Sequence, residues 1–213
     1  MNTPDAIGDL PMFPLGSVLF PGGVLPLHVF EPRYRALTGY CLERESPLGV
    51  VLIERGSEVG GGDVRFPVGT LGRIGRSVAL PDGRWMLAVV GERRIRIEDW
   101  LGEEPFPRAR ASFVDDTTPP GPGASRARDI VSERARAAIH LLARLGEWPP
   151  GDAAAPVAAD PAEAAWQVAG FGLLGPADSQ RVLETDGVEA RLDLLASLLA
   201  EQVDVLALRA AGR

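Results

Sequence analysis

Lysine is absent from this chain of 213 residues, and all 22 of its basic residues are arginine. A nucleotide-binding Walker A loop needs a lysine on the phosphates, and a serine–lysine protease dyad needs a lysine as its base. The chain therefore has neither of these catalytic arrangements. We expect that it is not an enzyme.

Cysteine and histidine are scarce as well, with one cysteine and two histidines. A single cysteine cannot form an internal disulfide, and Cys41 lies on the apolar face of an expected helix, where a buried thiol is more common than a nucleophile. His28 stands in an apolar run, and His140 lies off the apolar stripe of a later helix. Neither has the cysteine pair or His/Glu cluster that a metal site requires. We expect structural roles for all three residues, and no cofactor or metal.

No segment has the features of a secretion signal or of a membrane span. The first residues, MNTPDAIGDLP, form neither a basic nor an apolar signal region, and no run of about 18 apolar residues occurs. The hydrophobic content of 46 % is ordinary for a globular chain with a sizeable core. We therefore expect a cytoplasmic protein that does not enter the membrane.

The segment 10–37 is the most informative part of the sequence. It is dense in apolar residues, but prolines at positions 14, 21, 26 and 32 interrupt it. Because proline lacks a backbone donor and fixes φ, no single helix or central strand can run through all four. Pro32 instead suits the first turn of a helix. The predicted elements are strands at 12–13, 18–20 and 24–29, a turn at Pro21-Gly22-Gly23, and a helix with Tyr34, Leu37 and Cys41 on its apolar face.

The following segment continues as short strands. Residues 47–53 are apolar and β-branched after a proline break, which predicts a buried strand. The glycine-rich segment 54–63 leads into Val64 rather than into a helix with Lys-Ser or Lys-Thr, so we interpret it as a surface loop and not as a phosphate cradle. Further predictions are strands at 68–74, with glycines at close backbone approaches, at 77–80, at 85–90 and around Ile95 and Ile97, and a Pro81-Asp82-Gly83 hairpin turn.

The period of the apolar residues changes to a helical one after the linker-like segment 117–123, TTPPGPG. The segment 148–151 ends the first helix of this part, and residues 152–159 are rich in alanine and proline. Asp160-Pro161 offers a cap and a first turn for a helix over 162–171. The apolar stripes of the two longest expected helices are Val131, Ala135, Ala138, Leu142 and Leu145, and Val188, Leu192, Leu195, Leu199, Val203 and Leu206.

Three stretches together resemble the substrate-binding domain of Lon protease. The first is LPMFPLGSVLFPGGVLPLHVFEPRYR, which fits the pattern LPxFPLxxVxFPGxxLPLxxFExRYR; the second is the series Val68–Ile74, Pro81–Arg84 and Val90–Ile97. The third is SQRVLE followed by RLDLL, where Ser179 stands at a position that is lysine in the family's motif. The resemblance implies a PUA-like pseudo-barrel of mixed strands with one inserted helix.

The expected fold class is therefore α+β, a PUA-like mixed β pseudo-barrel with an inserted helix, followed by a C-terminal α-helical bundle. We place the β-rich subdomain at 1–116, the Pro/Gly linker at 117–123 and the helical subdomain at 124–213.

The resemblance also implies a function, the non-catalytic binding of exposed segments of other polypeptides. The candidate contact residues are Pro21, Glu31, Arg33 and Tyr34. A purely structural alternative exists for them, in which Glu31 faces the positive helix N-terminus, Arg33 pairs locally and Tyr34 packs. A further alternative is an adaptor that binds one dedicated protein partner, and the sequence does not distinguish it from a general binder of exposed segments. Because the family's domain can self-associate, a weak homodimer is compatible with the resemblance.

A second hypothesis is RNA binding. Seven arginines and two acidic residues lie between Arg65 and Arg96, a local charge of +5 in a chain whose net charge is −7. PUA-like barrels elsewhere bind RNA, so these strands offer contacts to phosphates. Only Phe66 and Trp85 provide aromatic rings there, which is few for base stacking. The candidate nucleic-acid contacts are Arg73, Arg76, Arg94 and Arg96.

Overall fold

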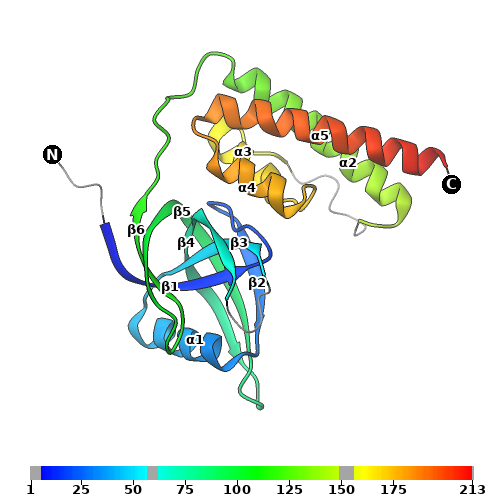
Figure 1. Ribbon diagram of the computed structural model, residues 1–213. Coiled ribbons are helices and arrows are strands. Elements are labelled where there is room, and N and C mark those ends of the chain that lie inside the picture. The colour runs from blue at the N-terminus through cyan, green and yellow to red at the C-terminus, as the bar shows by residue number, and fades with distance from the viewer. Residues whose placement is uncertain (1–5, 57–61, 149–155, 213) are drawn as a thin grey trace. The chain divides into compact units, whose positions relative to one another are not determined.

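The computed structural model describes residues 6–56, 62–148 and 156–212, and the account of the fold is restricted to them. The chain divides into two compact units, Met1–Asp115 and Asp116–Arg213. The first contains a mixed sheet and one helix, and the second contains only helices (Figure 1). The expected loops at 54–63 and 152–159 lie partly outside the described residues.

The first unit is a sheet that closes on itself. The strands pair in the order β2-β5-β4-β3-β1-β6, and β6 pairs in turn with β5, so that five of them form a ring. β1 and β3 run parallel, and all other pairs are antiparallel. The elements are β1 (Ala6–Leu15), β2 (Val24–Val29), α1 (Pro32–Arg44), β3 (Leu48–Arg55), β4 (Val64–Ala79), β5 (Trp85–Gly102) and β6 (Arg108–Phe113).

β5 makes this closure because it is 18 residues long. Its first half pairs with β2 on one side and with the end of β4 on the other, and its second half pairs with β4 and β6. β2 has no second partner among the described strands. It is therefore an edge strand beside the ring, which agrees with the proline at its centre, Pro26, since an edge position tolerates a missing backbone donor.

The buried residues of this unit form two clusters. Met12 and Ile95 belong to one, which draws on all five strands of the ring, and Leu37 and Val89 belong to the other, which includes α1 and β2. Helix α1 contributes Tyr34, Leu37, Thr38 and Cys41, which confirms the apolar face predicted from their spacing. Cys41 is a buried free thiol, as expected.

Several predicted strands differ from the observed ones. The strands expected at 85–90 and around Ile95 and Ile97 are one strand, β5. The strands expected at 68–74 and 77–80 are one strand, β4. The bulges at Leu71/Gly72 and Ile74/Arg76 shift the register with β5, but the pairing continues on both sides of each bulge. The strand expected at 18–20 does not form. Leu19 and Phe20 are buried, but the Leu19 carbonyl accepts a hydrogen bond from Thr70 Oγ1 at 2.5 Å, and Phe20 O accepts from Gly23 N in a turn.

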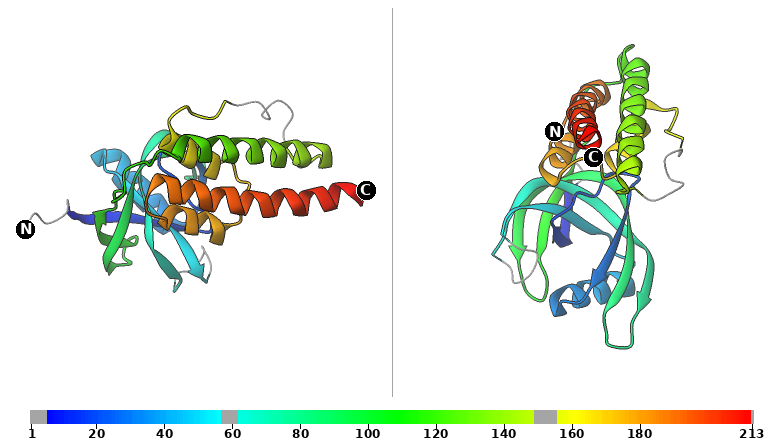
Figure 2. Two further views of the ribbon diagram at one scale, coloured as in Figure 1. Left: turned by 90° about the horizontal axis from the view of Figure 1, so that it is seen from above. Right: turned by 90° about the vertical axis from the view of Figure 1, so that its right-hand side faces the viewer.

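The described residues of the second unit form four helices, α2 (Ala124–Leu145), α3 (Pro161–Ala169), α4 (Pro176–Glu184) and α5 (Val188–Ala211). α2 and α5 run side by side for most of their length (Figures 1 and 2). The predicted cap of α3 is confirmed, since Asp160 Oδ1 accepts from Glu163 N at 2.9 Å and Pro161 is the first helical residue. The apolar stripes place Val131, Leu192, Leu195 and Leu199 in full burial.

Candidate functional site

An exposed sheet face lies on the outer side of β2, β5 and the end of β4. Antiparallel pairing places residues of these strands directly opposite one another, and alternate residues point to the same side. Neighbouring strands lie about 4.8 Å apart, so the members of a row are in reach of one another. We call this surface the outer face. Its three rows are Val24–Val90–Arg73, Pro26–Ala88–Arg76 and His28–Met86–Val78.

The apolar members of the outer face are open to solvent. Val24 is 62 % exposed, Val78 51 %, Met86 45 % and Val90 36 %. Single exposed apolar residues are normal on a protein surface, whereas adjacent ones in a shared register form a patch that marks an interaction site. The register makes the outer face a candidate for such a site.

The same strands are apolar on their inner side as well. Leu87 and Val89 are buried in the core, and Leu25 and Leu27 pack against it. An antiparallel sheet with one solvated face ordinarily alternates apolar and polar residues, and an edge strand usually carries charged side chains. β2, with the sequence VLPLHV, carries no Asp, Glu, Lys or Arg. Core formation explains Leu25, Leu27 and Val29 but not Val24.

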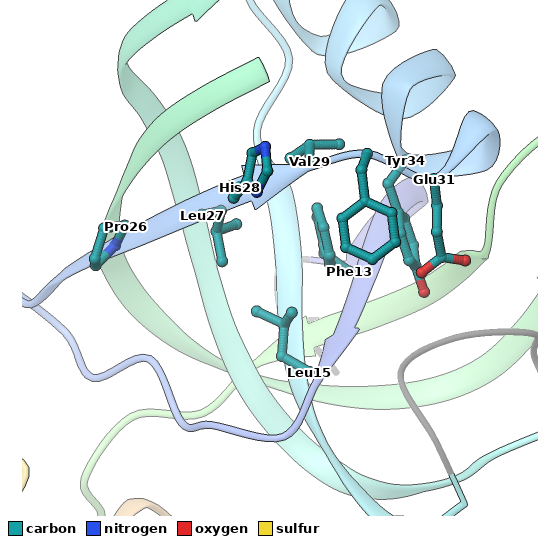
Figure 3. A pocket seen from close by; sticks show the side chains of 9 residues that line it. Phe13, Leu15, Pro26, Leu27, His28, Val29, Glu31 and Tyr34 are labelled. Atoms are coloured by element: carbon teal, nitrogen blue, oxygen red, sulfur yellow. The ribbon is translucent and has the colours of Figure 1, made fainter. Parts of the chain in front are cut away.

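A small cavity lies at β2 and the start of α1 and is lined by residues of both sides of β2 (Figure 3). Its volume is about 150 Å³. Its walls combine apolar side chains with the polar groups of His28, Glu31 and Tyr34. The lining residues are Phe13, Leu15, Pro26, Leu27, His28, Val29, Phe30, Glu31 and Tyr34.

Two of the candidate peptide contacts, Glu31 and Tyr34, line this cavity, and a third, Arg33, contacts both of them. Tyr34 is buried and its ring stacks on Phe13, with ring centroids 4.1 Å apart. The guanidinium of Arg33 lies 4.4 Å from the centre of the Tyr34 ring, and its Nε donates to Glu31 Oε2 at 3.1 Å. Burial raises the pKa of Tyr34 to about 12. This geometry gives Tyr34 a packing role and pairs Arg33 with Glu31.

The fourth candidate, Pro21, lies in a turn at the start of β2. The next residue, Gly22, has a φ of 73° and donates its N–H to Gly91 O at 2.9 Å, and the carbonyl of Gly23 accepts from Gly91 N. These bonds fasten the turn to β5. Pro21 precedes these residues in the turn and does not line the cavity.

The four candidate arginines do not form one surface. Arg73 Nε lies 2.7 Å from Glu92 Oε1, and Arg94 is only 4 % exposed. Arg76 lies opposite Ala88 on the outer face, whereas Arg96 lies eight residues further along β5, opposite Val68 and Ser112. Acidic partners also lie beside other arginines of this region: Arg65 pairs with Asp63 and Glu103, Arg84 with Asp82 and Arg93 with Asp115. The structure therefore does not favour a continuous phosphate-binding track.

The described residues hold no group of three metal-ligating side chains, and within them no helix is both long and apolar enough to cross a membrane. Burial raises the pKa of Cys41 to about 11, so the thiolate needed for nucleophilic attack is scarce at neutral pH.

Sequence reasoning missed the outer face. Val24, Pro26, Met86, Val78 and Val90 were read as ordinary strand residues. A signal was available in WMLAVV and VLPLHV, where apolar residues occupy both the odd-numbered and the even-numbered positions and therefore both faces of the strand. For a strand beside a solvated face this pattern indicates a second apolar surface.

Comparisons with known proteins agree with the family resemblance. The family model described as the ATP-dependent protease La (LON) substrate-binding domain matches residues 9–201. Lon protease of Phenylobacterium zucineum is 33 % identical over 206 residues, which are 92 % of this chain and 25 % of that protein. Lon protease 2 of Myxococcus xanthus is 31 % identical over 214 residues, 98 % of this chain and 25 % of that protein. The chain thus spans about a quarter of the length of these curated relatives.

Solved structures show the same fold. The crystal structure of a Lon N-terminal domain protein from Xanthomonas campestris superposes with a TM-score of 0.65 at 26 % identity, covering 90 % of this chain and 98 % of that one. The N-terminal domain of Mycobacterium avium complex Lon protease gives a TM-score of 0.60 at 19 % identity, covering 91 % and 98 %. The expected mixed sheet with several helices is confirmed as a Lon N-terminal-domain fold. The chain belongs to the family of the Lon protease substrate-binding domain.

Proposed function

We propose that this chain binds exposed, unfolded segments of other polypeptides on the outer face, without catalysing a reaction on them. The observation that carries the proposal is the apolar patch of Val24, Met86, Val78 and Val90, which is solvent-exposed in a shared register. An unfolded chain exposes apolar side chains that a folded one hides. Covering such side chains and this patch together removes apolar area from water.

The edge position of β2 gives such a ligand a backbone partner as well. In an antiparallel pair, alternate residues of a strand direct their N–H and C=O groups away from the partner strand. On β2 these groups face no second strand among the described residues. An extended segment can add to this edge and hydrogen-bond to it, which is a common mode of peptide recognition.

The family name supports the same reading, because the matching domain is described as binding substrates of a protease. We propose that this chain shares that role and the PUA-like barrel implied by its β pattern, with the β-rich subdomain, linker and helical subdomain at the boundaries given above. A non-catalytic role fits the absence of lysine, which removes the Walker A and serine–lysine arrangements from these 213 residues.

The test uses a second, fluorescently labelled protein that is kept permanently unfolded by reduction and carboxymethylation of its disulfides. This labelled protein is titrated with the purified chain. Fluorescence anisotropy is followed at low and moderate salt, and the same protein with its disulfides intact is the folded control. We expect saturable binding of the unfolded form that persists at moderate salt, because apolar contacts are not screened. Equal binding of both forms, or binding of neither, would reject the proposal in favour of a single dedicated partner.

A further inference from the structure

Arg76 is the one arginine of the outer face that has no ion pair among the described residues. It closes the central row, Pro26–Ala88–Arg76, and is exposed. The other arginine of the face, Arg73, is paired with Glu92 at 2.7 Å. None of the nine positions of the face carries an acidic residue. The face therefore presents apolar side chains around one uncompensated positive charge.

The acidic residues around the face are already engaged by other arginines. At the hairpin end of β4 and β5, Asp82 Oδ2 lies 2.6 Å from Arg84 Nε. After β2, Glu31 Oε2 lies 3.1 Å from Arg33 Nε. Arg35, from α1, extends to the hairpin, where its Nη2 would meet a Cβ placed on Gly83. These two carboxylates therefore already have arginine partners, and Arg35 adds a further positive charge near the hairpin.

An apolar ligand that covers this face must remove water from Arg76. Burying a charge without a partner is costly, and the cost falls when the ligand brings the opposite charge. A guanidinium binds a carboxylate through two parallel hydrogen bonds, which favours Asp or Glu at the position opposite Arg76. A lysine or arginine at that position would be repelled, and such repulsion is itself a source of specificity.

We propose that Arg76 is a specificity-determining residue of the polypeptide-binding surface, which selects extended apolar segments that carry an acidic residue among their apolar ones. The inference rests on the proposed function and names its ligand class. Apart from His28 and Arg73, the rest of the face is apolar and carries no Phe, Tyr or Trp ring for base stacking, so we take the complementary anion to be a side-chain carboxylate rather than a nucleic-acid phosphate.

The test uses three short labelled peptides of alternating aliphatic and hydroxyl residues, identical except for a central aspartate, asparagine or lysine. Each is titrated with the full chain and with its Arg76→Gln variant, and anisotropy gives the dissociation constants. For the unmodified chain we expect the aspartate peptide to bind about threefold more tightly than the asparagine peptide, the effect of a partly exposed ion pair, and the lysine peptide to bind most weakly. In Arg76→Gln the three constants converge.

The matched control is Arg96→Gln. Arg96 is also exposed and has no ion pair among the described residues, but it lies eight residues along β5 from the central row. We expect Arg96→Gln to keep the preference for aspartate. Equal binding of all three peptides by the unmodified chain would overturn the role of Arg76 and leave the proposed function standing. If none of the three peptides binds, both the role of Arg76 and the proposed function are overturned. If a short single-stranded RNA binds more tightly than the peptides, and Arg76→Gln abolishes that binding, the ligand of Arg76 is a nucleic-acid phosphate and the proposal of a carboxylate is overturned.

Discussion

Arg191 Nη2 donates a hydrogen bond to Asp116 Oδ1 at 2.5 Å, from a side chain that is completely buried. The guanidinium of Arg191 also lies 3.7 Å from the centre of the Trp166 ring, and Nη2 donates to the Thr185 carbonyl at 3.0 Å. Asp116 accepts a second bond from Gly187 N. The first residue of the helical unit is thereby fastened to the start of α5.

We expect Asp116→Ala to lower the free energy of unfolding by about 3 kcal/mol, because it leaves the buried Arg191 charge without its carboxylate. Urea unfolding followed by circular dichroism measures the change. The matched control is Asp178→Ala, whose carboxylate pairs with Arg181 at the surface, for which we expect about 1 kcal/mol or less. Equal costs for the two variants would contradict a structural role for the buried pair.

Tyr34→Phe should leave the protein as stable as before or stabilise it by up to about 1 kcal/mol. The Tyr34 hydroxyl is buried and has no hydrogen-bond partner among the described residues, so its removal relieves a desolvated polar group. Thermal unfolding at neutral pH measures the difference. A loss of stability larger than about 1 kcal/mol would show that the hydroxyl makes a bond that this structure lacks.

The same residue makes stability depend on alkaline pH. Burial raises the pKa of Tyr34 to about 12 from an ordinary value of 10.0, so the unfolded chain loses the phenol proton first. The stabilisation is therefore complete below about pH 10 and is lost as the pH rises towards 12. Absorbance at the tyrosinate wavelength separates the two tyrosines of the chain when the protein is compared with Tyr34→Phe. Ionisation of Tyr34 near pH 10 in the folded protein would contradict its burial.

Gly69→Ala should disrupt the pairing of β3 with β4. A Cβ at position 69 would overlap the Val50 carbonyl oxygen, which is a backbone atom held in the sheet and cannot move aside. It would also come within 2.6 Å of Val51 Cγ1. We expect a loss of about 3 kcal/mol or an unfolded product, as for other overpacked cores. Gly102→Ala is the control, since nothing lies within 4 Å of its Cβ position, and it should be nearly neutral. A Gly69→Ala variant whose free energy of unfolding is unchanged would contradict this register of β3 and β4.

Cys41 should resist alkylation in the folded protein. With a pKa of about 11 instead of 9.0, its thiolate is about a hundredfold scarcer at pH 8 than in the unfolded chain. Burial hinders the reagent further. The rate of iodoacetamide labelling by mass, with and without denaturant, checks this. Labelling as fast in buffer as in urea would contradict the buried position.

Much of the fold could be predicted from local sequence signals. The helix after Pro32 and the capped helix after Asp160 follow from cap and spacing rules that act within a few residues. The hairpin at Gly83, with a φ of 82°, and the close approach at Gly69 follow from the freedom that only glycine has. The irregular series of prolines and glycines in 10–37 also carried the family resemblance, which the comparisons confirm.

The rest depends on pairing between distant segments. The continuity of β4 across Gly72 and Gly75 is provided by bulges against β5, and no local rule places them. Strand β6 was not predicted, because its ladders join it to residues about a hundred positions away in β1 as well as to β5. The outer face escaped for the same reason, since Val24, Met86 and Val78 become neighbours only through the register of three strands.

The measurement that tests the central claim most directly compares binding of the labelled unfolded protein by three forms of the chain. These are the unmodified chain, a Val24→Ser/Met86→Gln variant of the outer face, and Leu208→Ser, an exposed apolar residue of α5. All three changes are at exposed positions and should leave folding intact, which circular dichroism verifies. We expect the outer-face variant to bind at least about tenfold more weakly, from the loss of two apolar contacts, and Leu208→Ser to bind as before. Unchanged binding by the outer-face variant would contradict the assignment of this surface.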